Sequence, residues 1–102
     1  MIEFMIPVPQ YDNEGRALSW EKDEFLGELL HLFGGWTQQS NALGAWRNAD
    51  GEVMYDYMTP VVFAVDEAQR DYVYDTLVPW VRSLFRQQAV YVRESTAKVS
   101  II

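Results

Sequence analysis

Cysteine is absent from this 102-residue chain. Disulfide bonds, thiolate nucleophiles and zinc sites built on cysteine are therefore excluded. Histidine is nearly absent, and His31 is the only one. A single imidazole cannot hold a metal ion by itself. We therefore predict no metal site and no cofactor, and we expect His31 at the surface of a helix.

The chain also lacks long hydrophobic runs and has few basic residues. No segment approaches the roughly 18 consecutive apolar residues of a membrane helix, and the N-terminus has no basic start typical of a signal peptide. Eight Lys and Arg face fifteen Asp and Glu, for a net charge of −7. Such a surface repels nucleic-acid phosphates and anionic membranes. We expect a cytoplasmic protein with no membrane association and no direct nucleic-acid binding.

Apolar side chains are plentiful: 49% of the residues are hydrophobic and 15% are aromatic, including four Trp and six Tyr. This composition is typical of a globular chain rather than a disordered one. At this length the chain buries about two thirds of its unfolded surface. We predict one domain spanning residues 1–102.

An alternating run and then a helical run open the chain. Residues 2–8 place apolar side chains at every second position, as in a strand with one face on a core. From Ser19 the apolar positions recur every three or four residues, which predicts a helix with Ser19 as its N-cap. Gly34 and Gly35 should end it through a left-handed cap.

Asn48-Ala49-Asp50-Gly51 is the sharpest local signal, because Asp-Gly favours a tight reversal between antiparallel strands. It predicts a hairpin of strands 43–48 and 52–57. The apolar run 61–65 continues the second arm. Because Pro60 cannot donate to a ladder, we expect a bulge or bend near Thr59–Pro60 instead of one long strand.

A second helix and a C-terminal strand region follow. Asp66 and Gln69 fit a capping-box variant that opens the helix. Pro79 falls inside it and should kink it, since its ring meets the preceding turn. Residues 89–94 alternate and residues 98–102 are largely apolar, so one bent strand or two short strands are both open. The whole order predicts an α+β ferredoxin-like βαββαβ sandwich, an antiparallel sheet with two helices on one face.

Catalytic patterns are weak. The serines lie in no Gly-x-Ser-x-Gly elbow, and most carboxylates fall where helix starts explain them. Asp56 stands out, because a carboxylate between Tyr55 and Tyr57 on a strand is costly unless it faces solvent, an Arg or a polar cavity. The catalytic residues are therefore unknown from sequence.

Aromatic residues exceed what a small core hides, since indole N–H and phenol O–H groups need polar partners when buried. Some should line a patch or cleft, and the open face of such a sheet is a natural place for a second subunit. The residues concerned are Trp36, Trp46, Tyr55, Tyr57, Trp80 and Tyr91.

The stretches Gly34-Gly35-Trp36-Thr37, Gly44-Ala45-Trp46 and Gln87-Gln88-Ala89-Val90-Tyr91-Val92 resemble a group of small uncharacterised bacterial and phage proteins. That group has the spaced pattern Gly-Gly-x-Thr, Gly-x-Trp, Gly, then Gln-x-x-Val-Tyr-Val, matched here over residues 33–92. The resemblance implies a ferredoxin-like sandwich and no established activity. It carries over Thr37, Trp46 and Gln87 as site positions.

Three functions remain open. The first is a non-catalytic protein-interaction or assembly module, most simply a homodimer through the open sheet face, with a further protein partner possible. The second is a small-molecule binding protein or enzyme, with Trp46, Asp56 and Tyr91 lining a pocket and Arg93 pairing an anionic group. The third is an acidic decoy that occupies a nucleic-acid-binding partner.

Overall fold

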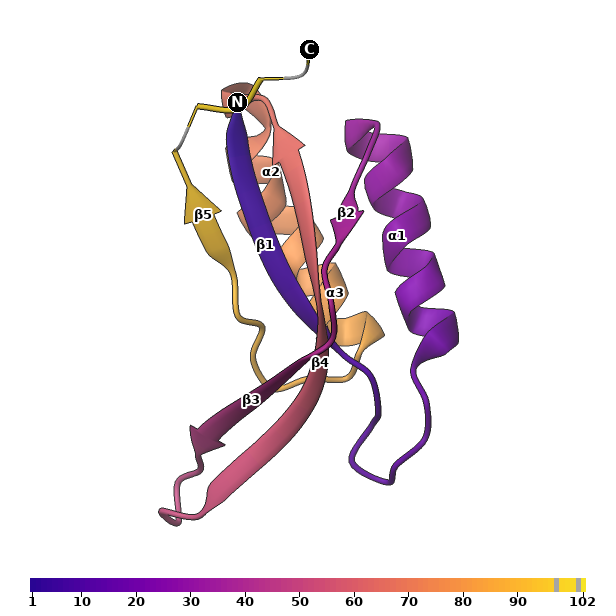
Figure 1. Cartoon of the computed structure of the whole chain (residues 1–102), viewed down its shortest axis with the longest axis vertical. Coiled ribbons are helices and arrows are strands. Elements are labelled where there is room, and N and C mark those ends of the chain that lie inside the picture. Colours follow the sequence, from indigo (N-terminus) through magenta and orange to yellow (C-terminus); the bar gives the residue numbers. More distant parts are fainter. Residues whose placement is uncertain (97, 101) are drawn as a thin grey trace.

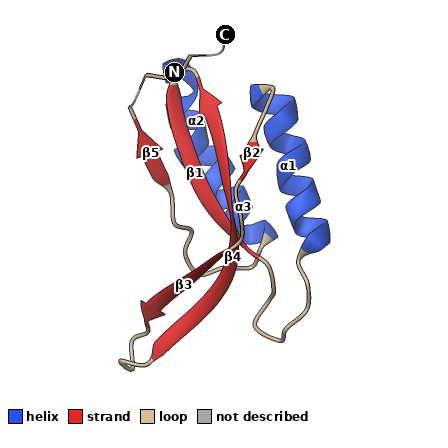
Figure 2. Ribbon diagram, in the orientation of Figure 1, coloured by secondary structure: helices blue, strands red, loops and turns tan. Residues whose placement is uncertain are grey.

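The computed structural model describes residues 1–96, 98–100 and 102. The chain forms one antiparallel sheet, and both of its helical regions pack on the same face of that sheet (Figures 1 and 2). This arrangement confirms the predicted α+β sandwich. The elements in chain order are β1 (Ile2–Pro9), α1 (Ser19–Phe33), β2 (Thr37–Gln38), β3 (Ala42–Arg47), β4 (Val53–Val65), the helical segments η1 (Glu67–Gln69), α2 (Arg70–Tyr72), η2 (Val73–Leu77) and α3 (Val78–Leu84), and β5 (Arg93–Ser95).

Strand β4 organises the sheet. Its C-terminal half pairs with β1 along one edge, from Met58 opposite Pro9 to Val65 opposite Ile2. Its other edge pairs first with β3 and then with β2, a short strand that the sequence pattern did not predict. Strand β5 adds to the free side of β1. Every pairing is antiparallel, as in the predicted βαββαβ order.

The core lies between the sheet and the helices. The predicted inner face of β1 is buried along its whole length, and alternate residues of β4 oppose it. Phe63 stacks on Phe4 and on Phe33, with ring centroids 5.7 and 5.5 Å apart, so it joins both central strands to the end of α1. The buried apolar residues are Ile2, Phe4, Ile6, Val8, Leu18, Phe25, Leu26, Leu29, Val61, Phe63, Val65, Val73, Leu77, Val81 and Phe85.

Helix α1 begins one residue differently from the prediction. Ser19 is its first helical residue, and Leu18 is the N-cap with no side-chain capping bond. Leu18 is fully buried, so packing of this side chain positions the helix start instead of a polar cap. The predicted end is confirmed: Gly34 has φ +82° and its N–H donates to the Leu30 carbonyl. His31 is exposed near this end, as expected.

The prediction at Thr59–Pro60 is corrected in part: β4 bends in its middle (Figure 1), but it has no bulge against β1 and is one long strand. Its pairing with β1 skips no residue. Pro60 lies opposite Pro7, two residues without N–H donors. On the other edge it lies between the last residue paired with β3, Met58, and the first paired with β2, Val61. The Gln39 N–H still donates to the Pro60 carbonyl at 2.9 Å, so the proline costs only the return bond of that pair, at the point where β4 changes partners.

Pro79, where a kink was predicted, lies directly after a change of helical type. The start of the second helical region is confirmed, since the Asp66 N–H donates to Gln69 Oε1 at 3.3 Å. Residues 73–77 then form a π-helical turn, in which the N–H of Val78 reaches the carbonyl of Val73, and Pro79 falls in the first turn of α3. The π-helical turn therefore comes directly before the residue that has no N–H for the regular bond to Asp75. No helix in the described part of the chain is long and apolar enough to cross a membrane.

The C-terminal segment is less regular than predicted. Of the expected strand 89–94, only Arg93 and Glu94 pair with β1, in a strand that continues to Ser95. Residues 98–100 and 102 are in no strand, while positions 97 and 101 of the expected second run lie outside the described residues. Only a single short strand is therefore described here.

Candidate functional site

The β3–β4 hairpin extends beyond the sandwich as an arm (Figure 1). We call β3, the turn and residues 53–57 of β4 the hairpin arm. The predicted reversal forms it: Gly51 has φ +82°, and the Asn48 side-chain oxygen accepts N–H groups from Asp50 and Glu52 at 3.0 and 2.9 Å. This reversal sets the register of the two strands.

The hairpin arm exposes large apolar side chains on both faces. Cross-strand pairing places Leu43 opposite Tyr57 and Trp46 opposite Met54. Alternation puts these two pairs on opposite faces. The exposed large apolar residues of the arm are Leu43, Trp46, Val53, Met54, Tyr55 and Tyr57. A lone apolar side chain at a surface is ordinary, whereas six large ones on a single hairpin are more than scattered exposure.

Two predicted site residues meet on the arm. Trp46 Nε1 donates to Asp56 Oδ2 at 2.7 Å across the two strands. This bond explains how Asp56 is tolerated on the strand, since the carboxylate is exposed and holds the indole. Gly44 lies directly opposite Asp56, and the end of the Met58 side chain lies over the position that a Cβ at Gly44 would occupy. The Trp46–Asp56 pair therefore orients an exposed aromatic and forms no enclosed pocket.

The structure does not bring the other predicted residues to this pair. Thr37 pairs with Val62 at one edge of the open sheet face, and Arg93 pairs with Met5 toward the opposite edge. Tyr91 is exposed in the segment before β5. Gln87 lies beyond α3, where its side-chain amide donates to the Phe85 carbonyl at 3.0 Å.

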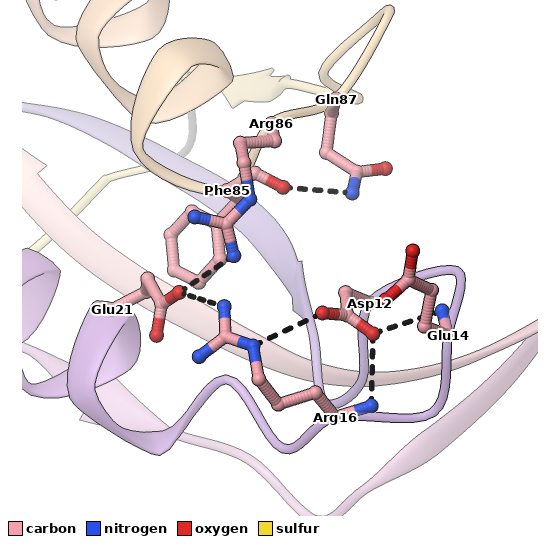
Figure 3. Close-up of polar contacts among 7 residues, drawn as sticks. All are labelled: Asp12, Glu14, Arg16, Glu21, Phe85, Arg86 and Gln87. Carbon is pink, nitrogen blue, oxygen red and sulfur yellow. Dashed lines mark hydrogen bonds and ion pairs between the residues drawn. The ribbon is translucent and has the colours of Figure 1, made fainter.

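A cluster of ion pairs around one buried carboxylate lies next to Gln87 (Figure 3). Glu21, in the first turn of α1, is 2% exposed. Its Oε2 accepts from Arg16 Nη2 at 2.9 Å and from Arg86 Nη2 at 3.0 Å. Arg16 also donates through Nε to Asp12 Oδ2 at 3.1 Å. We call Asp12, Arg16, Glu21 and Arg86 the arginine cluster; it joins the loop before α1 to the end of α3.

The cluster keeps its groups charged. Burial raises the pKa of Glu21, but hydrogen bonds from Arg16 and from its own backbone outweigh burial, so this pKa lies below its usual value. The backbone N–H of Arg16 is the main cause that lowers the pKa of Asp12. The hydrogen bond to Glu21 is the largest cause that raises the pKa of Arg16. Glu21 Oε1 is buried without a hydrogen-bond partner among the described residues.

Arg86 occupies a backbone position that ordinarily suits glycine. Its φ is +53°, the one positive value among the non-glycine residues that the structure describes. The Gln87 N–H donates to the Arg82 carbonyl and the Arg86 N–H to the Ser83 carbonyl, which is the Schellman arrangement with Arg86 at the left-handed position. A side chain there costs about 1–2 kcal/mol. Arg86 adopts this strained backbone conformation, and from that position its side chain donates to Glu21.

A hollow of about 380 Å³ opens beside the cluster, lined by Asp12, Asn13, Glu14, Arg16, Phe85, Arg86 and Gln87. A second hollow, of about 230 Å³, lies around Gln10, Lys22 and Thr59. Some of its polar groups are already bonded, since Gln10 Nε2 donates to the Met58 carbonyl and Thr59 Oγ1 to Asn41 Oδ1.

Sequence reasoning missed the arginine cluster. In the sequence, Glu21 suits the first turn of one helix and Arg86 the end of another, where the helix dipole favours each charge, and 65 residues separate the two. No local spacing connects such positions. The available hint was the ending of the second helix, where no glycine follows, because a helix that ends without glycine can place another residue in the left-handed position.

Comparison with known proteins supports the fold. No protein-family model matches the sequence, and neither does any curated protein. The structure is similar to CutA from Xylella fastidiosa, with a TM-score of 0.70 and 11% identity over 98% of this chain and 86% of that one. It is also similar to the divalent ion tolerance protein CutA1 from Ehrlichia chaffeensis, with a TM-score of 0.67 and 8% identity over 98% and 84%.

A phage SAM lyase in its apo state is similar as well, with a TM-score of 0.68 and 11% identity over 92% of this chain and 78% of that one. At such identities the likeness establishes the ferredoxin-like α+β architecture alone. These neighbours have different names and roles, and one fold hosts many functions.

Proposed function

We propose that this chain is a non-catalytic assembly module that associates with a second copy of itself, most simply as a homodimer. The observation that carries this proposal is the hairpin arm, which leaves the sandwich and exposes six large apolar side chains on its two faces. Leu43, Val53, Tyr55 and Tyr57 lie on one face of the arm, and Trp46 and Met54 lie on the other.

Unpaired strand edges support association. Among the described residues, β3 pairs only with β4, and residues 53–56 of β4 pair only with β3, whereas the Tyr57 carbonyl already accepts the Gln10 N–H at 2.9 Å. The arm therefore presents open edges beside exposed aromatics, a combination that soluble proteins usually cover. A partner lying against the arm would cover both features together.

Continuity with the open sheet face favours a second copy as the partner. By alternation along β4, Trp46 and Met54 share the face that continues through Met58 to Val62, on the side away from the helices. Met5, half-buried, lies on the same face opposite Val62. One copy's arm against this face of the other gives a self-complementary contact that closes as a pair. A stable interface needs about 800 Å² per partner, and the arm supplies much of it.

Light scattering of the purified chain tests the proposal. We expect a mass of twice the 11.9 kDa of one chain. Trp46→Ser should raise the dissociation constant at least about thirtyfold, equivalent to about 2 kcal/mol, as for a buried interface tryptophan. Tyr55→Ser should weaken association from the other face of the arm.

Trp20→Ser is the matched control, because Trp20 is as exposed as Tyr55, at 65% for both, but lies on α1. It should leave the mass unchanged. A wild-type chain that stays monomeric at every concentration would exclude the proposed function, as would equal effects of Trp20→Ser and Trp46→Ser.

A further inference from the structure

Two guanidinium groups share one carboxylate oxygen at the wall of the 380 Å³ hollow (Figure 3). Arg16 and Arg86 both donate to Glu21 Oε2, and Arg16 has Asp12 as a second anion. Arg86 pairs with no other carboxylate in the part of the chain described. It is therefore the cation with the least compensation in the cluster.

Several donors of this pair remain unused. Arg16 Nη1, Arg86 Nη1 and Arg86 Nε donate to none of residues 1–96, 98–100 and 102. Both side chains are more than half exposed, at 54% and 58%, and both line the hollow. Glu21 anchors them from the buried side, so their positions are set before any ligand arrives.

The strained backbone at Arg86 also indicates a role for this side chain at the hollow. Glycine would form this helix end without strain, and the chain does use glycine at the end of α1. Glu21 already has Arg16 as a partner, so neutralising Glu21 does not require a second arginine. What Arg86 adds is a second guanidinium beside the hollow.

The other residues that line the hollow indicate where an anionic group would lie. Asp12 is engaged by Arg16 and by two backbone N–H groups, so its charge is largely satisfied. Glu14 is exposed and its carboxylate is unpaired among the described residues, and Gln87 adds an amide. The volume is in the range of small-ligand sites. An anionic group therefore belongs at the arginine wall, away from Glu14.

We propose that this hollow is a binding site for a small molecule carrying an oxyanion, a carboxylate or a phosphate group, held by the guanidinium groups of Arg16 and Arg86. The planar guanidinium fork fits both kinds of group through paired N–H donors. This site is separate from the hairpin arm, so the proposal does not depend on assembly.

The test is a titration of the ¹⁵N-labelled full chain with sodium phosphate and, in a second arm, sodium acetate, at constant ionic strength. The arginine Nε–H signals of Arg16 and Arg86 should shift and saturate. Saturation by phosphate alone assigns a phosphate group, and saturation by acetate assigns a carboxylate. Shifts that stay linear with both anions, or spread over all exposed arginines, would overturn the site.

Arg86→Gln should weaken binding about tenfold or more, as expected for the loss of a charged bidentate donor. Arg82→Gln, in the last turn of α3 and with the same charge change, should leave it unchanged. Arg86→Gly guards against misfolding, because glycine suits φ +53° while the guanidinium is lost; it should fold and bind no better than Arg86→Gln. Equal weakening by Arg82→Gln and Arg86→Gln, or full binding by folded Arg86→Gly, would refute the proposal.

Discussion

At the scale of single residues, Glu21 is the group whose surroundings matter most. A carboxylate this buried is tolerated only when charged partners and hydrogen bonds offset the loss of water. Arg16 and Arg86 provide them from two segments that are far apart in sequence. The cluster therefore links the loop before α1 to the end of α3, and its strength depends on the charge of Glu21.

This dependence predicts an effect of pH. A free glutamate has a pKa of about 4.3, and that of Glu21 in the folded chain is lower. The unfolded chain thus takes up the proton first, so the stabilisation is complete at neutral pH and is lost as the pH falls through the lower, folded pKa. Glu21→Gln should lower the urea midpoint at neutral pH and flatten its fall in acid. Urea unfolding of both chains at several pH values measures this.

Glu24→Gln is the matched control, on the same helix but exposed. Its acid limb should follow that of the wild type. Some acid dependence should survive in Glu21→Gln, because the pKa of Asp12 is lowered as well. An acid limb as steep in Glu21→Gln as in the wild type would contradict the role given to Glu21.

At the scale of elements, two glycines of α1 should respond to alanine with opposite signs. Gly27 lies inside the helix, and a Cβ there meets nothing within 4 Å. Gly27→Ala should therefore stabilise the fold by about 0.5–1 kcal/mol. Gly34→Ala should destabilise it by about 1 kcal/mol or more, because φ +82° strains an alanine even in open space. Urea unfolding at neutral pH measures both, and equal signs would contradict this account.

Local patterns predicted the elements whose causes are local. Alternation placed β1, helical spacing placed α1, and Asp50-Gly51 placed the hairpin, since each signal lies within a few residues of its effect. The length of β4 could not be predicted in this way. Whether Pro60 breaks a strand depends on which neighbours lie beside it, and those neighbours are set by tertiary pairing.

The candidate sites differ in the same way: relations between residues close in sequence could be predicted, and relations between distant segments could not. Trp46 and Asp56 were chosen from one hairpin, and the structure joins them because hairpin register is a local property. Arg93 and Tyr91 come from a distant segment whose strand proved shorter than predicted, so their relation to the arm followed from no local rule. The arginine cluster, which links positions 21 and 86, was outside the reach of spacing arguments altogether.

At the scale of the whole molecule, apolar attraction and charge repulsion oppose each other. Each chain carries a net charge of −7, and Asp50 and Glu52 lie at the tip of the arm. Two copies therefore repel at long range, while contact between arms buries apolar surface. The change of the dissociation constant with salt should therefore show whether apolar burial or charge attraction drives association.

Salt should strengthen self-association of this chain. The screening length falls from about 30 Å at 0.01 M to about 8 Å at 0.15 M ionic strength, so the repulsion between two acidic copies shrinks while apolar burial does not. The dissociation constant measured by analytical ultracentrifugation should fall several-fold across this range. An association held by ion pairs, or by a basic partner on an acidic face, would weaken instead. Weaker association at higher salt would therefore remove the apolar arm as the cause of assembly and favour binding through the acidic surface.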